Sequence, residues 1–83
     1  MNEQDINAMI SQLGGKSNIN SVMACATNRL RFTLEQDEEL DVQALTKLPC
    51  VNAVMQPQTK VVHLLLNEDA SPWAAKLIAQ LDN

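Results

Sequence analysis

The segment SVMACATNRLRFTL, residues 21–34, contains the pattern that decides the fold. Apolar and polar side chains alternate on both sides of Thr27-Asn28, and alternation with a period of two is typical of a half-buried β-strand. A two-residue turn joins antiparallel strands. We therefore expect a β-hairpin with strands at residues 21–27 and 29–34. Its apolar face should consist of Val22, Ala24, Ala26, Leu30, Phe32 and Leu34.

The other face of this hairpin carries reactive side chains. Cys25 lies within six residues of both Arg29 and Arg31, and the alternation allows all three to point to the same uncovered face. Cysteine attacks as the thiolate, which neighbouring positive charge stabilises. Guanidinium groups present planar forks of donors that match phosphate oxygens. The pattern indicates a cysteine that handles phosphate.

Three segments outside this hairpin have helical periodicity. Asn2 is a candidate N-cap for the first helix, and Gly14-Gly15 is a typical helix stop. Asp41 is the expected N-cap of the second helix, and Ser71-Pro72 is expected to begin the third. The apolar stripes of the three helices are Ile6, Met9, Ile10 and Leu13; Val42, Leu45 and Leu48; and Ala74, Leu77, Ile78 and Leu81.

A second hairpin is predicted between the last two helices. Residues 51–56 and 60–66 are rich in β-formers, and they flank Pro57-Gln58-Thr59, a turn-like segment. The order is then helix, hairpin, helix, hairpin, helix. We expect an α+β fold, a two-layer sandwich with a four-stranded antiparallel sheet and helices on one face. At 83 residues, the chain should form a single domain, residues 1–83.

Composition excludes several classes of function. A net charge of −4 argues against nucleic-acid binding, which needs clustered lysine and arginine. Two cysteines and one histidine lack the spacing of a zinc site, and no motif indicates a cofactor. No run approaches the roughly 20 apolar residues of a membrane span, and no signal peptide is evident. We expect a cytoplasmic protein with reduced thiols.

Several motifs in order resemble a known family. Residues 13–19 read LGGKSNI, residues 24–27 read ACAT and residues 29–32 read RLRF. This order resembles the IIB domain of the glucose family of bacterial sugar phosphotransferase systems, in which LGG, a short gap and NI precede CxTRLR. Residues 51–54 are similar to the GVxxV strand of that family. The resemblance covers roughly residues 10–66.

The resemblance implies a phosphotransferase, the IIB component of a protein-phosphohistidine–sugar phosphotransferase, acting in sugar transport. Cys25 would accept a phosphoryl group from a phosphohistidine on a IIA partner and pass it to a sugar at a membrane IIC permease. Arg29 and Arg31 would hold the phosphoryl oxygens, and Thr27 would add a hydroxyl donor. Asn18 would shape the turn below the site without a catalytic role. A permease partner would bring the domain to the inner face of the membrane.

The family pattern also leaves alternatives open. Arginine directly follows Cys-x-Thr in the family, whereas Asn28 is inserted here. Counting forward from residues 13–15 places Cys25 on the family cysteine, and counting back from residues 29–31 places Ala26 there. We favour Cys25, because a β-bulge can absorb one residue. The second reading is a non-catalytic interaction or regulatory domain that binds a permease or a transcriptional repressor, and a third is a redox pair of Cys25 and Cys50.

Three further residues have ordinary structural interpretations. His63 lies in the apolar run Val61–Leu65, where a strand residue with a locally satisfied ring is a better interpretation than a second phosphoryl carrier. Cys50 is expected to be structural, at the start of a strand. Trp73 is expected to cap the core.

Overall fold

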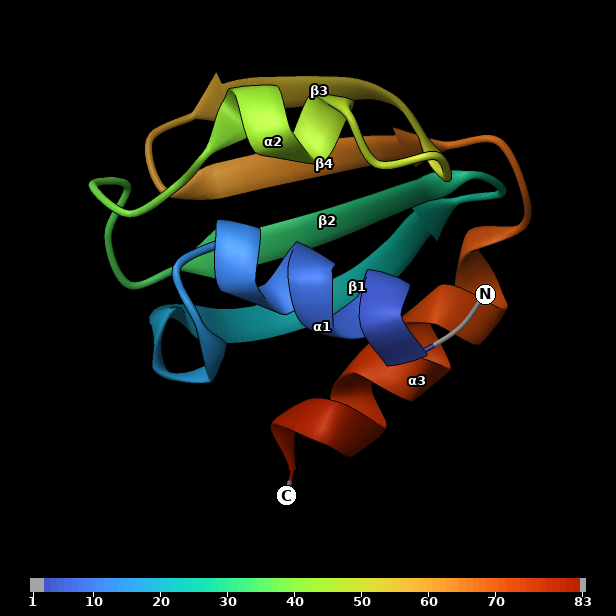
Figure 1. Ribbon diagram of the computed structural model, residues 1–83, viewed down its shortest axis with the longest axis horizontal. Helices are drawn as coiled ribbons and strands as arrows, with labels where there is room; N and C mark the ends of the chain where they lie inside the picture. Colours follow the sequence, from blue (N-terminus) through green and yellow to red (C-terminus); the bar gives the residue numbers. More distant parts are fainter. Residues whose placement is uncertain (1–2, 83) are drawn as a thin grey trace.

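The computed structural model describes residues 3–82, and the predicted N-cap Asn2 lies outside them. Four strands form one antiparallel sheet in the order β1-β2-β4-β3 (Figure 1). The elements follow one another as α1 (Glu3–Gln12), a 3₁₀ turn (Lys16–Asn18), β1 (Ile19–Ala26), β2 (Arg29–Leu34), α2 (Val42–Thr46), β3 (Val51–Gln58), β4 (Val61–Leu66) and α3 (Ala70–Leu81).

The predicted α+β class and order of elements are confirmed. Figure 1 shows α1, α2 and α3 on the same side of the sheet, with α3 packed against β1 and β2 and α2 packed against β3. Among residues 3–82, no helix covers the other face of the sheet. The two-layer arrangement leaves this face open to solvent, and we call it the open face.

The core lies between the sheet and the helices. Alternate residues of β2 are buried, namely Leu30, Phe32 and Leu34, as the period of two predicts. They pack with apolar residues from all three helices, including Ile6, Met9, Leu13, Leu45, Trp73 and Leu77. Trp73 is therefore a core member, with 1% of its surface exposed, and it is not only a cap over the core. Val42 and Ile78, expected on the apolar stripes, are exposed.

The N-cap of α2 agrees with the prediction, whereas that of α3 does not. The side chain of Asp41 accepts a hydrogen bond of 3.0 Å from the amide of Ala44. For α3, Asp69 is the N-cap, and its carboxylate accepts from the amide of Ser71. Pro72 then lies within the first turn, where a missing N–H costs no intrahelical bond. The helix starts two residues before the position expected from Ser71-Pro72.

The second hairpin turns later than expected. The strand β3 continues through Pro57 to Gln58, and the turn is Thr59-Lys60, with Lys60 at a φ of 65°. Because β3 is an edge strand, Pro57 needs no amide hydrogen on the side that has no partner. The ladder between β3 and β4 is irregular between Met55 and Gln58, so proline coincides with a bulge.

The turn after α1 is built around Asn18. Its buried side chain donates to the carbonyl oxygens of Leu13 (2.7 Å) and Gln36 (3.0 Å) and accepts from the amide of Gln36 (3.1 Å). Gly14 has a φ of 104°, and a Cβ there would lie 2.5 Å from Nδ2 of Asn18. Glycine at this position allows both the helix stop and the close approach of Asn18.

Candidate functional site

Cys25 occupies a β-bulge at the end of β1. In the β1–β2 ladder, Ala24 pairs with Leu30 and Ala26 pairs with Arg29, so Cys25 has no partner opposite it. The bulge breaks the predicted alternation, since Ala26 now shares a face with Arg29 and is exposed, instead of joining Val22 on the apolar face. The Cys25 thiol is free and exposed.

Arg29 and Arg31 lie on the open face beside this bulge. They alternate with the buried residues of β2, and each is partly exposed. Arg31 is opposite Met23, two residues before Cys25, and Arg29 is opposite Ala26, the residue after it. The structure thus brings Cys25 next to the β1 positions that pair with the two arginines, at one end of the sheet.

The open face around the arginines carries no carboxylate. Within the described residues, the register of the four strands gives the residues that lie on this face. They are Ser21, Met23, Ala26, Arg29, Arg31, Thr33, Ala53, Met55, Gln58, Val61, His63 and Leu65, with Cys25 exposed at the bulge. Although the whole chain has a net charge of −4, this surface is cationic. An anion approaching Cys25 therefore meets positive charge without competing acidic groups.

The turn Thr27-Asn28 is tied to the end of β4 and the start of α3. The carbonyl oxygen of Thr27 accepts from the amide of Ala70 at 2.8 Å. The amide of Leu66 donates to the carbonyl oxygen of Asn28 at 2.7 Å, and Nδ2 of Asn28 donates to the carbonyl oxygen of Leu66 at 3.1 Å. The extra residue Asn28 is thus an anchor for the hairpin, and the Thr27 side chain remains exposed next to Cys25.

His63 lies on the same open face, directly opposite Arg31 in the β2–β4 ladder. Its Nε2 is 3.5 Å from Nη1 of Arg31. Burial lowers the pKa of His63, and the charges of Arg29 and Arg31 lower it further. The sequence predicts that His63 lies in a strand, but it does not predict the contact with Arg31. The two residues are 32 positions apart, and they meet only because β2 pairs with β4.

Comparisons with known proteins identify relatives of this chain. A family model described as phosphotransferase system, EIIB, matches residues 7–41, which include Cys25 and both arginines. The N-acetylmuramic acid-specific EIIBC component of a PTS system from Pasteurella multocida (strain Pm70) is 37% identical over 73 residues. The chain belongs to the EIIB family.

The aligned part of this EIIB chain is 88% of its length but only 15% of the Pasteurella relative. A solved structure, one domain of the PTS system IIabc component from Clostridium difficile, covers 95% of the chain and 77% of that domain with a TM-score of 0.71. Its sequence identity is 22%, so this likeness concerns the fold. Within residues 3–82, no helix is both long and apolar enough to span a membrane.

The second cysteine of the EIIB domain has a different environment. Cys50 is 7% exposed and belongs to the core cluster on the helix side of the sheet, whereas Cys25 is exposed at the hairpin. Burial raises the pKa of the Cys50 thiol, and the charges of Asp5 and Glu68 raise it further. Both thiols are free. A structural role for Cys50 agrees with this burial.

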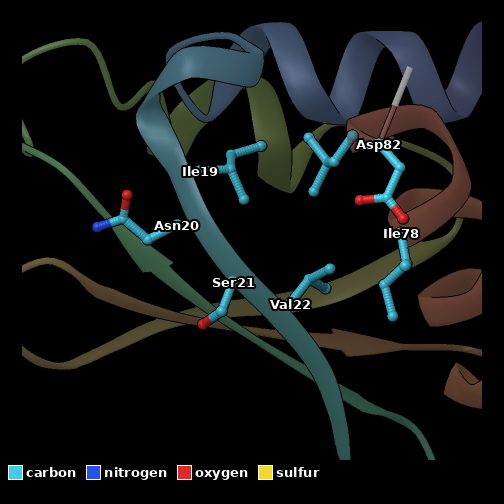
Figure 2. Close-up of a pocket in the computed structure, with 7 residues that line it drawn as sticks. Ile19, Asn20, Ser21, Val22, Ile78 and Asp82 are labelled. Carbon is cyan, nitrogen blue, oxygen red and sulfur yellow. The ribbon is translucent and has the colours of Figure 1, made fainter.

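A hollow of about 350 Å³ lies between β1 and the end of α3, away from Cys25. Figure 2 shows Ile19 and Val22 pointing toward α3, with the carboxylate of Asp82 beside Ile78. Asp82 is the one charged residue among those that line the hollow, and its carboxylate would repel a phosphate. The candidate site at Cys25 is therefore an exposed strand end and does not lie in this hollow.

Proposed function

We propose that this chain is a phosphoryl relay in a sugar phosphotransferase system, with Cys25 as the residue that carries the phosphoryl group. The observation that supports this role best is the exposed thiol at the bulge, beside two arginines on a face without carboxylates. The EIIB match over residues 7–41 covers the same residues.

In the first step, the thiolate of Cys25 attacks the phosphorus of a phosphohistidine on a IIA protein. The S–P bond forms, the P–N bond breaks, and its electron pair returns to the imidazole, which takes up a proton. In the second step, a sugar hydroxyl attacks the phosphocysteine at a membrane IIC permease. The O–P bond forms, the thiolate leaves, and the hydroxyl proton passes to a base or to solvent.

Arg29 and Arg31 have the chemistry to hold the transferred group. Phosphoryl transfer relies on positioning and on stabilising the charge of the equatorial oxygens, and guanidinium forks do both. Nε of Arg29 is buried and has no hydrogen-bond partner within residues 3–82. Such a group costs free energy in the resting protein, which supports a functional reason for its position. Thr27, exposed beside Cys25, would add a hydroxyl donor.

The family context supports the two partners. The Pasteurella relative is named an EIIBC component and the Clostridium protein a IIabc component, so both names join the B part with further components. We infer that the chain acts between a IIA donor and a IIC permease in the cytoplasm, at the membrane when the permease is bound. Cys25 is exposed at the bulge, as docking of a IIA protein on the thiol would require.

Intact-mass spectrometry tests the proposal directly. The chain is incubated with phosphoenolpyruvate, the general phosphotransfer proteins and a IIA partner, and we expect the mass of one added phosphoryl group, located on the Cys25 peptide. The variant Cys25→Ser should gain no mass, and the control Cys50→Ala should be phosphorylated as the wild type is. An unmodified mass with every IIA protein supplied would refute the relay.

The same variants separate the relay from a binding module. A domain that only binds a permease or a repressor would retain its partner affinity and cellular effect in Cys25→Ser. A relay would lose sugar phosphorylation while its fold and its docking persisted.

A further inference from the structure

In the part of the chain that the structure describes, Arg31 has one strong side-chain acceptor within reach, the ring of His63. Its cross-strand neighbours on the open face are Met23 in β1 and His63 in β4. The thioether of methionine is a weak acceptor, whereas an imidazole nitrogen is a strong one. The hydroxyl of Ser21, further along β1, already bonds that of Thr33. His63 is therefore the residue that can fix the Arg31 guanidinium.

The direction of this hydrogen bond determines the state of the ring. A guanidinium has donors and no acceptor, so Nη1 of Arg31 donates and Nε2 of His63 accepts over the 3.5 Å between them. The acceptor nitrogen carries no proton, and the proton of the neutral ring must lie on Nδ1. The same ring, once protonated, would have no lone pair for Arg31 and would repel it.

We propose that His63 is a positioning residue that holds the Arg31 guanidinium on the open face, where it can bind the phosphoryl group carried by Cys25. The inference rests on the relay proposed above and assigns a role that the family pattern does not give to this position. His63 touches the arginine and is not required to touch the phosphoryl group.

Protonation of His63 would then break its hydrogen bond with Arg31. The groups that face His63 are Arg29 and Arg31 from β2 and Met55 from β3, with Val61 and Leu65 beside it on β4. Both arginines remain charged at all relevant pH values. Since burial and these charges lower the pKa of His63, the ring remains neutral near pH 7, and acidification through its pKa would release Arg31.

Two substitutions of His63 distinguish a role in positioning Arg31 from a merely structural role in the sheet. His63→Gln replaces the ring by a neutral amide whose oxygen can accept from Arg31 at every pH. We expect it to retain most of the transfer rate and to lose the acid-side decline. His63→Leu removes the acceptor, and we expect the rate of Cys25 phosphorylation to fall roughly tenfold or more, because small displacements of a positioning group are costly. Met55→Leu, on the other side of His63, is the matched control.

The ratio of the rates of wild type and His63→Gln, measured across pH, isolates the histidine. The two proteins differ only at residue 63, so the ratio compares the histidine with the amide. A ratio that falls toward acid pH supports the inference. Equal pH profiles, or a His63→Leu protein that transfers at the rate of Met55→Leu, would overturn it, as would a phosphoryl group found on His63 itself.

Nitrogen NMR of the single histidine provides a test without phosphotransfer. We expect the signals of the Nδ1–H tautomer, and a higher His63 pKa in Arg31→Gln than in the wild type. The opposite tautomer in the neutral ring, or an unchanged pKa, would contradict the pairing. If no IIA protein phosphorylates Cys25, the relay fails while the NMR result stands. If His63→Leu is phosphorylated normally, the positioning role fails while the relay stands.

Discussion

Asn28 and Leu66 exchange two hydrogen bonds, although 38 residues separate them. The amide of Leu66 donates to the carbonyl oxygen of Asn28, and Nδ2 of Asn28 donates to the carbonyl oxygen of Leu66. The tip of the first hairpin is thus fixed to the end of the central strand β4. Because Cys25 lies three residues before Asn28, this bracing supports the segment that carries the thiol.

Replacing Asn28 by alanine should weaken the hairpin tip. The backbone bond to Leu66 remains and the side-chain bond is lost, so we expect the free energy of unfolding to fall by about 1 kcal/mol, measured by urea denaturation. Asn52→Ala is the matched control, since its amide reaches the same carbonyl oxygen at a longer 3.4 Å. A larger loss in Asn52→Ala than in Asn28→Ala would contradict the anchoring role.

The local elements could be predicted because their signals are local. The alternation of residues 29–34 and the N-cap Asp41 depend on neighbours in sequence, and the structure agrees with both. The turn predicted at Pro57 was wrong, because proline is tolerated in an edge strand such as β3. Whether a strand lies at an edge depends on the order of strands in the whole sheet, which local sequence does not show. Ser71 was expected to be the N-cap of the third helix, but Asp69 takes this position, because its carboxylate accepts a hydrogen bond from the amide of Ser71.

The site was predictable in part for the same reason. Cys25, Arg29 and Arg31 lie in one hairpin, so pairing across a short turn brings them together. The contact between Arg31 and His63 arises from the pairing of β2 with β4, which have a helix and another strand between them in the chain. Sequence periodicity shows which face a residue occupies, and it does not show which strand lies beside it.

The two cysteines should differ sharply toward alkylating reagents. Iodoacetamide reacts with the thiolate, so the exposed Cys25 should be modified in the folded protein. Cys50, whose burial raises its pKa, should be modified only after unfolding. Mass spectrometry should find one adduct in buffer and two in urea. Modification of Cys50 at the same rate as Cys25 in buffer would refute the assigned burial.

Asn18 should contribute strongly to stability. Replacing it by alanine removes three hydrogen bonds, two to Gln36 and one to Leu13, and leaves buried backbone groups without partners. We expect a loss of about 3 kcal/mol in the free energy of unfolding. Asn20→Ala, at an exposed position two residues later, should change it by less than about 0.5 kcal/mol. Similar losses in the two variants would contradict the structural role.

Stability should depend on pH through His63. The folded protein holds the pKa of His63 below its ordinary value of 6.5, so the unfolded chain binds more protons in this range. The free energy of unfolding should therefore decrease as pH falls below about 6.5 toward the folded pKa. Urea denaturation at about pH 7.5 and about pH 5.5 should show a smaller decrease for His63→Gln. Equal decreases in the two proteins would contradict the lowered pKa.

Arg31 provides the sharpest test of the open face as a phosphoryl site. Arg31→Gln removes the charged fork that we propose binds the transferred group, and we expect the initial rate of Cys25 phosphorylation to fall by about 100-fold. Arg31→Lys keeps the charge and loses the planar fork, so its rate should lie between those of the wild type and the glutamine variant. Lys76→Gln, which removes an exposed cation from α3 on the helix side, controls for net charge. If Lys76→Gln slowed the reaction as much as Arg31→Gln, overall charge and not the geometry of the open face would govern the transfer.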